Sequence, residues 1–406
     1  MMPLHTTPTP TIIRHVRHKM HKRSEPICAY FYDLDALAGH VQAMRHALPL
    51  FCELFYAVKA NAAPPLLHVL ASLCDGFEVA SGGELAHIRR YQPQARLLFG
   101  GPGKLESELE AALFPPIEAL HVESLHELEL IHDIAEKKQC VAPIMVRLNL
   151  PRGDGAATRL VMSGTPSAFG IDEAHFEQAL TVIRNSKWLS FKGLHLHAQS
   201  HQCDAAEHGA MLRGFLRHIN ELEDCLSFHA PIINLGGGMG VAYQEPHHHF
   251  DWPSFCQMLQ NLPNTERRER HFRFEVGRFM TAFCGVYAME VIDLKQSYGE
   301  WFAIARGGTH HFRLPSAQAH SHPIHVVRAS RPPDITHQQV TVTGQLCTPK
   351  DVLARHVPIE ALAPGDVFLL PMAGAYGWSI SHHDFLMHPP PHHYFIQKDR
   401  IWEEKI

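Results

Sequence analysis

Eight short, strand-like apolar runs recur between residues 54 and 278. They are LFYAVK (54–59), GFEVAS (76–81), ARLLFGG (95–101), ALHVES (119–124), APIMVRLNL (142–150), FKGLHLHA (191–198), PIINLGGG (231–238) and HFRFEVGR (271–278). The segments between them, such as 64–74 and 81–92, are long enough for a helix and carry apolar residues at helical spacing. Strands that alternate with helices form parallel β/α units, and eight such units predict an α/β (β/α)8 TIM-like barrel.

The pattern changes after about residue 280. Strand-like runs at 286–295, 300–306, 324–329, 337–344 and 366–371 follow one another with little helix between them. This arrangement predicts an antiparallel β-domain over residues 281–406, after a barrel over residues 33–280. Residues 1–32 precede the barrel, and we expect them to join the β-domain.

Composition excludes several classes of protein. The formal net charge is −5 over 406 residues, so no electrostatic argument favours binding to nucleic acid or to an anionic membrane. No apolar run is long enough to span a bilayer, and the basic N-terminus lacks a secretory signal, so we expect a cytoplasmic protein. Nine scattered cysteines indicate reduced thiols. The 34 histidines carry no HExxH or CxxC spacing, and we therefore expect no metal site.

Reactive side chains follow the predicted barrel strands, at the ends where barrel enzymes place their functional residues. They are Lys59, Glu78, Glu123, Arg147, His197, Gly236–Gly238, Glu275 and Arg278. Lys59 is either a surface lysine or an amine that forms Schiff bases with carbonyl compounds. The glycine run forms either a simple turn or a backbone cradle for a phosphate. The polar, Gly-rich stretch 150–164 is typical of a functional loop.

Nine motifs then carry a family resemblance. They are YDLDAL (32–37), YAVKAN (56–61), EVASGGEL (78–85), SAFGID (167–172), GLHLHAQS (193–200), NLGGGMG (234–240), EVGR (275–278), GQLCTPKD (344–351) and GAYG (374–377). In this order the chain resembles, over residues 28–390, the fold-type III decarboxylases that depend on pyridoxal 5'-phosphate (PLP). This group contains diaminopimelate, ornithine and arginine decarboxylases and has the fold of alanine racemase.

The resemblance implies a role for each cofactor-binding residue. Lys59 would carry PLP covalently, His197 would stack on its ring, and Glu275 would pair with the ring nitrogen. Glu78 and Arg147 would lie near the phenolic side of the ring. The phosphate would be held by Ser200, the backbone of Gly236, Gly237 and Gly238, Arg278 and Tyr376. Cys347 would reach in from a partner subunit and help to reprotonate the product, so the resemblance also implies a homodimer with shared active sites.

Glu275 favours decarboxylation over racemisation. Loss of CO2 leaves a carbanion, for which a protonated pyridine ring is an electron sink. A carboxylate beside the ring nitrogen raises its proton affinity. The similar barrel of alanine racemase places an arginine there, so a racemase is the weaker alternative.

The residues after Cys347 bear on the substrate. Diaminopimelate and ornithine decarboxylases carry a carboxylate there for the distal ammonium of their small-molecule amino-acid substrates, whereas this chain has Thr348, Pro349 and Lys350. We therefore expect an uncharged or anionic distal group, as in the siderophore-pathway branch that this sequence resembles, where substrates include citryl conjugates of diamino acids. Candidate substrate-binding residues are Arg313, Thr348, Lys350 and Asp351. Alternatives are diaminopimelate decarboxylase and a non-catalytic regulator of the same fold.

Overall fold

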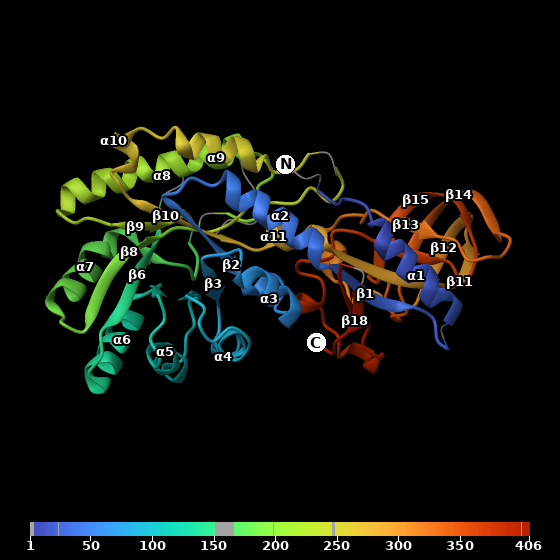
Figure 1. The fold of residues 1–406 in the computed structure, drawn as a ribbon, viewed down its shortest axis with the longest axis horizontal. Helices are drawn as coiled ribbons and strands as arrows, with labels where there is room; N and C mark the ends of the chain where they lie inside the picture. The colour runs from blue at the N-terminus through green and yellow to red at the C-terminus, as the bar shows by residue number, and fades with distance from the viewer. Residues whose placement is uncertain (1–3, 23, 151–165, 198, 246–247, 399) are drawn as a thin grey trace. The chain divides into compact units, whose positions relative to one another are not determined.

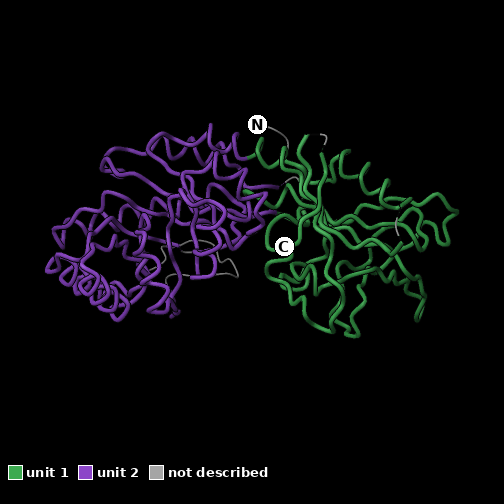
Figure 2. Tube along the Cα trace, turned by 60° about the horizontal axis from the view of Figure 1, so that its bottom comes forward, with its two compact units in different colours: residues 1–40, 242–247, 280–406 green, residues 41–241, 248–279 purple. Residues whose placement is uncertain are grey.

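Eight parallel strands close into a barrel in one unit of the protein (Figure 1). The computed structural model describes residues 4–22, 24–150, 166–197, 199–245, 248–398 and 400–406. It divides into a barrel unit, residues 41–241 and 248–279, and a β-unit, residues 1–40, 242–247 and 280–406 (Figure 2). Apart from Leu150, the predicted functional loop at 150–164 lies outside the described residues.

The barrel strands follow the predicted runs. They are β2 (Cys52–Ala57), β3 (Gly76–Val79), β4 (Leu97–Phe99), β5 (Ala119–Val122), β6 (Ala142–Asn149), β8 (Leu189–His195), β9 (Ile232–Asn234) and β10 (His271–Val276). Their order is β5-β4-β3-β2-β10-β9-β8-β6, and a further β5–β6 pairing closes the ring. A two-residue strand, β7 (Ile171–Asp172), adds to β6. Each predicted run overlaps one strand of the ring, although β2 and β8 begin two residues before their runs, so the predicted barrel is confirmed.

The helices of the barrel unit follow the strands in alternation. They are α3 (Pro64–Ala71), α4 (Gly82–Tyr91), α5 (Glu106–Leu113), α6 (Leu125–Lys138), α7 (Phe176–Asn185), α8 (Ala205–Leu226), α9 (Trp252–Gln260) and α10 (Asn264–Arg267), with 3-10 turns η1 (Val58–Ala60) and η2 (Glu173–His175). Ser81 and Ser124 cap α4 and α6 by accepting hydrogen bonds from backbone N–H groups. These caps turn the chain just after β3 and β5, which leaves the last residues of those strands at the barrel mouth.

Apolar side chains fill the inside of the barrel. Phe55, Leu98, Ala119 and Met145 form one buried cluster, against which Ile232 packs. They come from β2, β4, β5, β6 and β9, several of which are not neighbours in the sheet, so their contacts cross the interior. The barrel is therefore a packed core, and chemistry is confined to its end.

The β-unit is built on one mixed sheet of nine strands. They are β1 (Cys28–Asp33), β11 (Gly285–Ser297), β12 (Glu300–Ala305), β13 (His325–Val327), β14 (Ile335–Thr343), β15 (Val352–Leu362), β16 (Val367–Leu370), β17 (His392–Gln397) and β18 (Arg400–Glu403). Most pairings are antiparallel, as expected, but β1–β17 and β12–β14 are parallel. The five predicted runs correspond to β11, β12, β13, β14 and β16, whereas β1, β15, β17 and β18 lie outside them.

The remaining helices belong to the β-unit or lead into it. They are α1 (Pro10–Lys22), α2 (Leu34–Ala47), α11 (Arg278–Thr281) and α12 (Leu314–Gln318), with 3-10 turns η3 (Ala282–Cys284), η4 (Trp378–Ile380) and η5 (Phe385–Met387). Ile12 and Val16 of α1 are buried in a core with residues of β1, β11, β13, β16 and β17. The N-terminal segment therefore shares a core with the C-terminal sheet. No helix in the described part of the chain is long and apolar enough to cross a membrane.

Candidate active site

Lys59 lies in the 3-10 turn η1 directly after β2, where the chain leaves the barrel. Its Nζ is 3.0 Å from Oε2 and 3.2 Å from Oε1 of Glu78, which belongs to the neighbouring strand β3. The Lys59 side chain is 47% exposed, whereas that of Glu78 is 4% exposed. Burial raises the pKa of the Glu78 carboxyl; the Lys59 ammonium opposes this rise and the charge of Glu275 adds to it. The site therefore combines a reachable amine with a buried carboxyl group.

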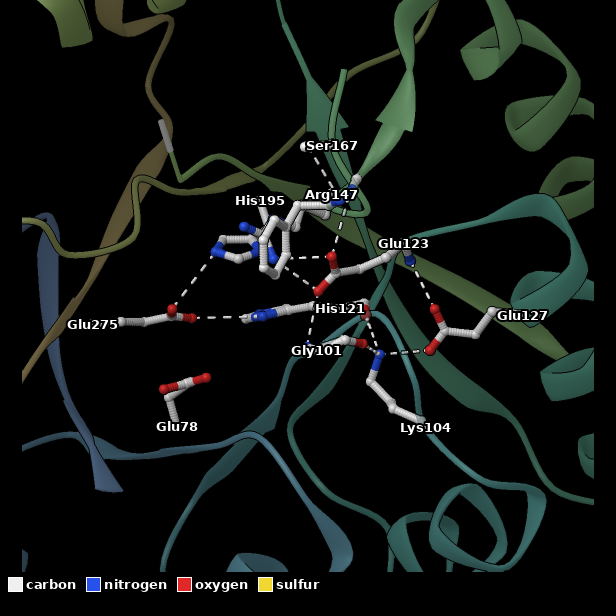
Figure 3. A network of polar contacts seen from close by, with 12 residues as sticks. Glu78, Gly101, Lys104, His121, Glu123, Glu127, Arg147, Ser167, His195 and Glu275 are labelled. Carbon is white, nitrogen blue, oxygen red and sulfur yellow. Dashed lines mark hydrogen bonds and ion pairs between the residues drawn. The ribbon is translucent and has the colours of Figure 1, made fainter. Parts of the chain in front are cut away.

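Glu275 near the end of β10 is a second buried carboxylate. Its Oε1 accepts a hydrogen bond of 2.6 Å from Nδ2 of Asn234 at the end of β9. Two buried histidines, His121 and His195, also lie beside the Glu275 carboxylate (Figure 3). Three other strands, β5, β8 and β9, thus contribute to the surroundings of one carboxylate.

Arg147 and Glu123 form a buried ion pair beside this group (Figure 3). Nη1 of Arg147 donates to both oxygens of Glu123, at 2.8 and 2.9 Å, and backbone N–H groups of Gly101 and Gly170 donate to the same carboxylate. These four hydrogen bonds from three donors satisfy Glu123, which holds the Arg147 guanidinium in one place.

Lys104 is buried and links the loop after β4 to β5. Its Nζ donates to the carbonyls of Gly101 and His121 and to Oε1 of Glu127, at 2.7, 2.8 and 2.5 Å. This ammonium is therefore occupied by structural contacts, and it fixes the strand end that carries His121.

His197 and the glycine run meet after β8 and β9. The backbone N–H of Gly237 donates to Nδ1 of His197 at 3.2 Å, so Nδ1 is unprotonated and the ring proton lies on Nε2, 3.3 Å from the Ser200 hydroxyl. Burial lowers the pKa of His197 well below its usual value, so the ring is neutral. His197 therefore contacts both of the sequence-predicted residues Ser200 and Gly237.

The glycines themselves allow no side chain. A Cβ on Gly236, where φ is +65°, would lie 2.5 Å from Nδ1 of His197. A Cβ on Gly237 would lie 2.2 Å from the carbonyl oxygen of Glu275. These glycines are required by close approach, and they leave bare backbone between His197 and Glu275, as a phosphate cradle needs.

The other predicted site residues lie elsewhere along the chain. Arg278 begins α11, three positions after Glu275. Tyr376 follows β16 in the β-unit with φ of +51°. Arg313, Cys347 and Lys350 are exposed, and Thr348 is half-buried, all within the β-unit.

Asp351 differs from these neighbours because it is buried. Its Oδ1 accepts from the backbone N–H and the hydroxyl of Thr309, and its Oδ2 accepts from the backbone N–H of Leu346. Its carboxylate therefore holds the Cys347 loop against the segment that contains Thr309. Its expected contact with the substrate stays a prediction.

Comparisons with known proteins define the family. Residues 34–282 match the family described as "Pyridoxal-dependent decarboxylase, pyridoxal binding domain". The chain is 38% identical to 2-[(L-alanin-3-ylcarbamoyl)methyl]-2-hydroxybutanedioate decarboxylase of Staphylococcus aureus, over 96% of this chain and 99% of that protein. The chain belongs to the pyridoxal-dependent decarboxylases. The enzyme is also 28% identical to diaminopimelate decarboxylase of Bacteroides thetaiotaomicron, over 86% of this chain and 90% of that protein.

A solved structure agrees with the fold of the enzyme. Diaminopimelate decarboxylase from Helicobacter pylori, complexed with L-lysine, matches with a TM-score of 0.84 at 24% identity and covers 95% of each chain. The likeness shows that the barrel and the mixed sheet together are the fold of this decarboxylase.

The cofactor of this family is PLP, and the barrel unit has a matching group for each of its reactive parts. An aldehyde needs an amine, which Lys59 presents beside Glu78. A protonated ring nitrogen needs a carboxylate, which Glu275 presents at 7% exposure. A phosphate needs backbone that it can approach closely, and Gly236–Gly238 provide such a stretch without side chains; within it, the N–H groups of Gly236 and Gly237 donate to Asn234 and His197. The residues therefore fit the cofactor.

Sequence reasoning missed His121, Asn234 and Lys104. His121 and Asn234 lie two positions before Glu123 and Gly236, which the sequence did single out. Residues two apart in a strand lie on the same face of the sheet. His121 and Asn234 could therefore have been predicted as site residues from their positions two residues before Glu123 and Gly236. Lys104 lies in a loop and gave no comparable signal.

Proposed function

We propose that this enzyme decarboxylates the amino-acid part of a citrate–diamino acid conjugate in siderophore biosynthesis. The observation that carries the proposal is the 38% identity, over nearly the whole of both chains, to the S. aureus decarboxylase. The name of that substrate describes a hydroxylated tricarboxylic skeleton joined through an amide to carbon 3 of alanine. Such a molecule has an α-amino acid at one end and free carboxylates at the other.

The loop after Cys347 is compatible with an anionic distal group. Lys350 is exposed there, and Thr348 occupies a position where the diaminopimelate branch is expected to have a carboxylate. An ammonium attracts the carboxylates of a citrate-type group and repels the distal ammonium of diaminopimelate, ornithine or lysine. Arg313 is a second exposed cation of the same unit.

Several residues of the chain would each have a separate role in the reaction. Bound PLP supplies an electron sink for the charge left when CO2 departs. Lys59 would hold the cofactor and then release it to the substrate amine, and Glu275 would keep a proton on the ring nitrogen. His197, as a neutral ring, would cover one face of the cofactor. Cys347 would deliver a proton to the product carbon.

Assembly and location complete the proposal. We infer a homodimer in which Cys347 serves the active site of the second copy; its exposure is compatible with this role. None of the nine cysteines, all of which the structure describes, forms a disulfide, which agrees with a reducing compartment.

The experiment is a substrate comparison with the purified, PLP-loaded enzyme. Release of CO2 and the mass of the amine product are followed with citryl-diaminopropionate, diaminopimelate, ornithine, lysine and 2,4-diaminobutyrate. We expect the citryl conjugate to be preferred by kcat/KM, and Lys59→Ala to be inactive on it. Rapid turnover of diaminopimelate alone would make the enzyme a diaminopimelate decarboxylase, and turnover of no amino acid would favour a non-catalytic regulator.

A loop variant tests the basis of the preference. Replacing Lys350 with Glu inverts the charge offered to the distal group. We expect KM for the citryl conjugate to rise by roughly tenfold, with less change in kcat, because uniform binding is lost. Lys137→Glu, which inverts an exposed charge on α6, is the matched control.

A further inference from the structure

A stacked pair of histidines supports the Glu275 carboxylate from within the barrel (Figure 3). The rings of His121 on β5 and His195 on β8 lie 4.1 Å apart at an angle of 26°. Nδ1 of His121 is 3.5 Å from Oε1 of Glu275, and Nε2 of His195 is 3.5 Å from Oε2. Each histidine therefore faces a different oxygen of the same carboxylate.

Asn234 determines which nitrogen of His121 carries the proton. Oδ1 of Asn234 accepts from the backbone N–H of Gly236 at 2.9 Å, which fixes the orientation of the amide. Its Nδ2 therefore donates, to Oε1 of Glu275 at 2.6 Å and toward Nε2 of His121 at 3.4 Å. A nitrogen that accepts is unprotonated, so the proton of His121 lies on Nδ1 and points to Glu275.

Both histidines are uncharged at neutral pH. Burial lowers the pKa of each well below its usual value. For His121 the charge of Glu275 opposes this shift, whereas the nearby cations Lys104 and Arg147 add to it for both histidines. The Nδ1–H group of His121 therefore offers Glu275 a dipole without a positive charge, and His195 places a second neutral ring beside Oε2 of Glu275.

A metal ion is a poorer occupant of this place than the cofactor ring. His121, His195 and Glu275 have the residue types and proximity of a metal site. However, the lone pair of an imidazole lies in its ring plane, so two nearly stacked rings do not aim their lone pairs at one point. In addition, Nδ1 of His121 carries a proton and has no lone pair to give.

We propose that His121 and His195 are positioning residues that hold Glu275 as an anion facing the cofactor ring nitrogen. A cationic neighbour would neutralise the carboxylate and weaken its attraction for a protonated ring, whereas neutral dipoles stabilise the anion and leave its charge available. The inference rests on the proposed function only in taking Glu275 as the partner of that nitrogen, and it is independent of the substrate.

The test separates the ring of His121 from its N–H group. His121→Phe keeps an aromatic ring and removes the donor, whereas His121→Gln keeps a neutral donor. The control is His393→Phe, the same change at a buried histidine of β17 whose pKa burial lowers to about 4. The dissociation constant of PLP is measured by titrating each apoenzyme with PLP, and the visible absorption spectrum of the bound cofactor is recorded.

We expect His121→Phe to weaken PLP binding by roughly tenfold, because the Glu275 carboxylate loses an N–H group that faces it at 3.5 Å, and to shift the absorption spectrum. His121→Gln should restore both within about threefold, and His393→Phe should leave both unchanged. If His121→Phe does not fold, His121→Met provides the donor-free variant.

Wild-type affinity and spectrum in the donor-free variant would overturn the inference, and so would equal losses in His121→Gln and His121→Phe. Failure of the citryl conjugate as a substrate would overturn the proposed function and leave this result standing.

Discussion

Lys59 and Glu78 form an ion pair of 3.0 Å in which the ammonium is half exposed and the carboxylate is buried. Glu78 lies on β3, and Lys59 directly follows the neighbouring parallel strand β2, so both are at the same end of the barrel. The arrangement keeps the lysine near the barrel mouth while its side chain remains reachable, as a covalent cofactor anchor requires. Burial raises the pKa of Glu78 and the charge of Lys59 lowers it, so the pKa of Glu78 changes whenever the charge of Lys59 does.

Replacement of Lys59 with Ala should remove covalent PLP binding. The expected result is loss of the visible absorption of the lysine-bound cofactor, no fixation of PLP by borohydride, and a fall in kcat of about a thousandfold or more. Lys137→Ala, on the exposed surface of α6, should behave as wild type. If the Lys59→Ala variant still retained PLP after borohydride reduction, the cofactor would be attached to another lysine.

Replacement of Gly237 with Ala should disrupt the cradle between His197 and Glu275. The new Cβ would lie 2.2 Å from the Glu275 carbonyl oxygen, so the backbone must shift and the affinity for PLP should fall by at least roughly tenfold. The matched change is Gly214→Ala within α8, where a Cβ meets nothing within 4 Å. That variant should bind PLP normally and gain about 0.5–1 kcal/mol in stability. Equal affinities in the two variants would contradict the assignment.

The Arg147–Glu123 pair should matter for stability because it is buried. Arg147→Met leaves Glu123 charged in the interior, and we expect the free energy of unfolding of the apoenzyme in urea to fall by about 3–5 kcal/mol. Arg213→Met breaks the more exposed pair with Glu266 and should cost less than about 1 kcal/mol. Adding Glu123→Gln to Arg147→Met should recover much of the loss. Similar losses in the two single variants would show that burial is not the cause.

Acid should destabilise the β-unit through its buried histidines. Burial lowers the pKa of His310 and of His393 to about 4, whereas both titrate near 6.5 when unfolded. The unfolded chain therefore takes up protons first as the pH falls, so the stability contributed by each neutral ring is present above about pH 6.5 and is lost progressively toward pH 4.

His310→Phe tests this dependence, since phenylalanine keeps a ring and cannot be protonated. We expect the variant to lose less stability between pH 7 and pH 5 than the wild type, measured by urea unfolding at each pH. A wild type whose stability is the same at both values would refute the prediction.

Local sequence patterns predicted the strands of the barrel more completely than those of the β-unit. All eight barrel strands overlap separate apolar runs, so their number could be counted from the sequence. In the β-unit, β15 contains Pro358 within its strand, and β17 directly follows the proline run 389–391 and begins with two histidines. Such residues weaken the local strand signal, and the pairing of β1 with β17, near opposite ends of the chain, has no local signal at all.

The sequence by itself determined the number and type of the barrel elements, the family, the cofactor, and the strand-end residues Lys59, His197, Gly237 and Glu275, because each depends on a short pattern. Only the tertiary structure decided what surrounds those residues. Asn234 reaches Glu275 from 41 positions away, and His121 reaches it from a strand on the other side of the closed ring. Hydrogen-bond partners, burial and the resulting pKa values depend on which strands converge, and closure of the barrel sets that convergence.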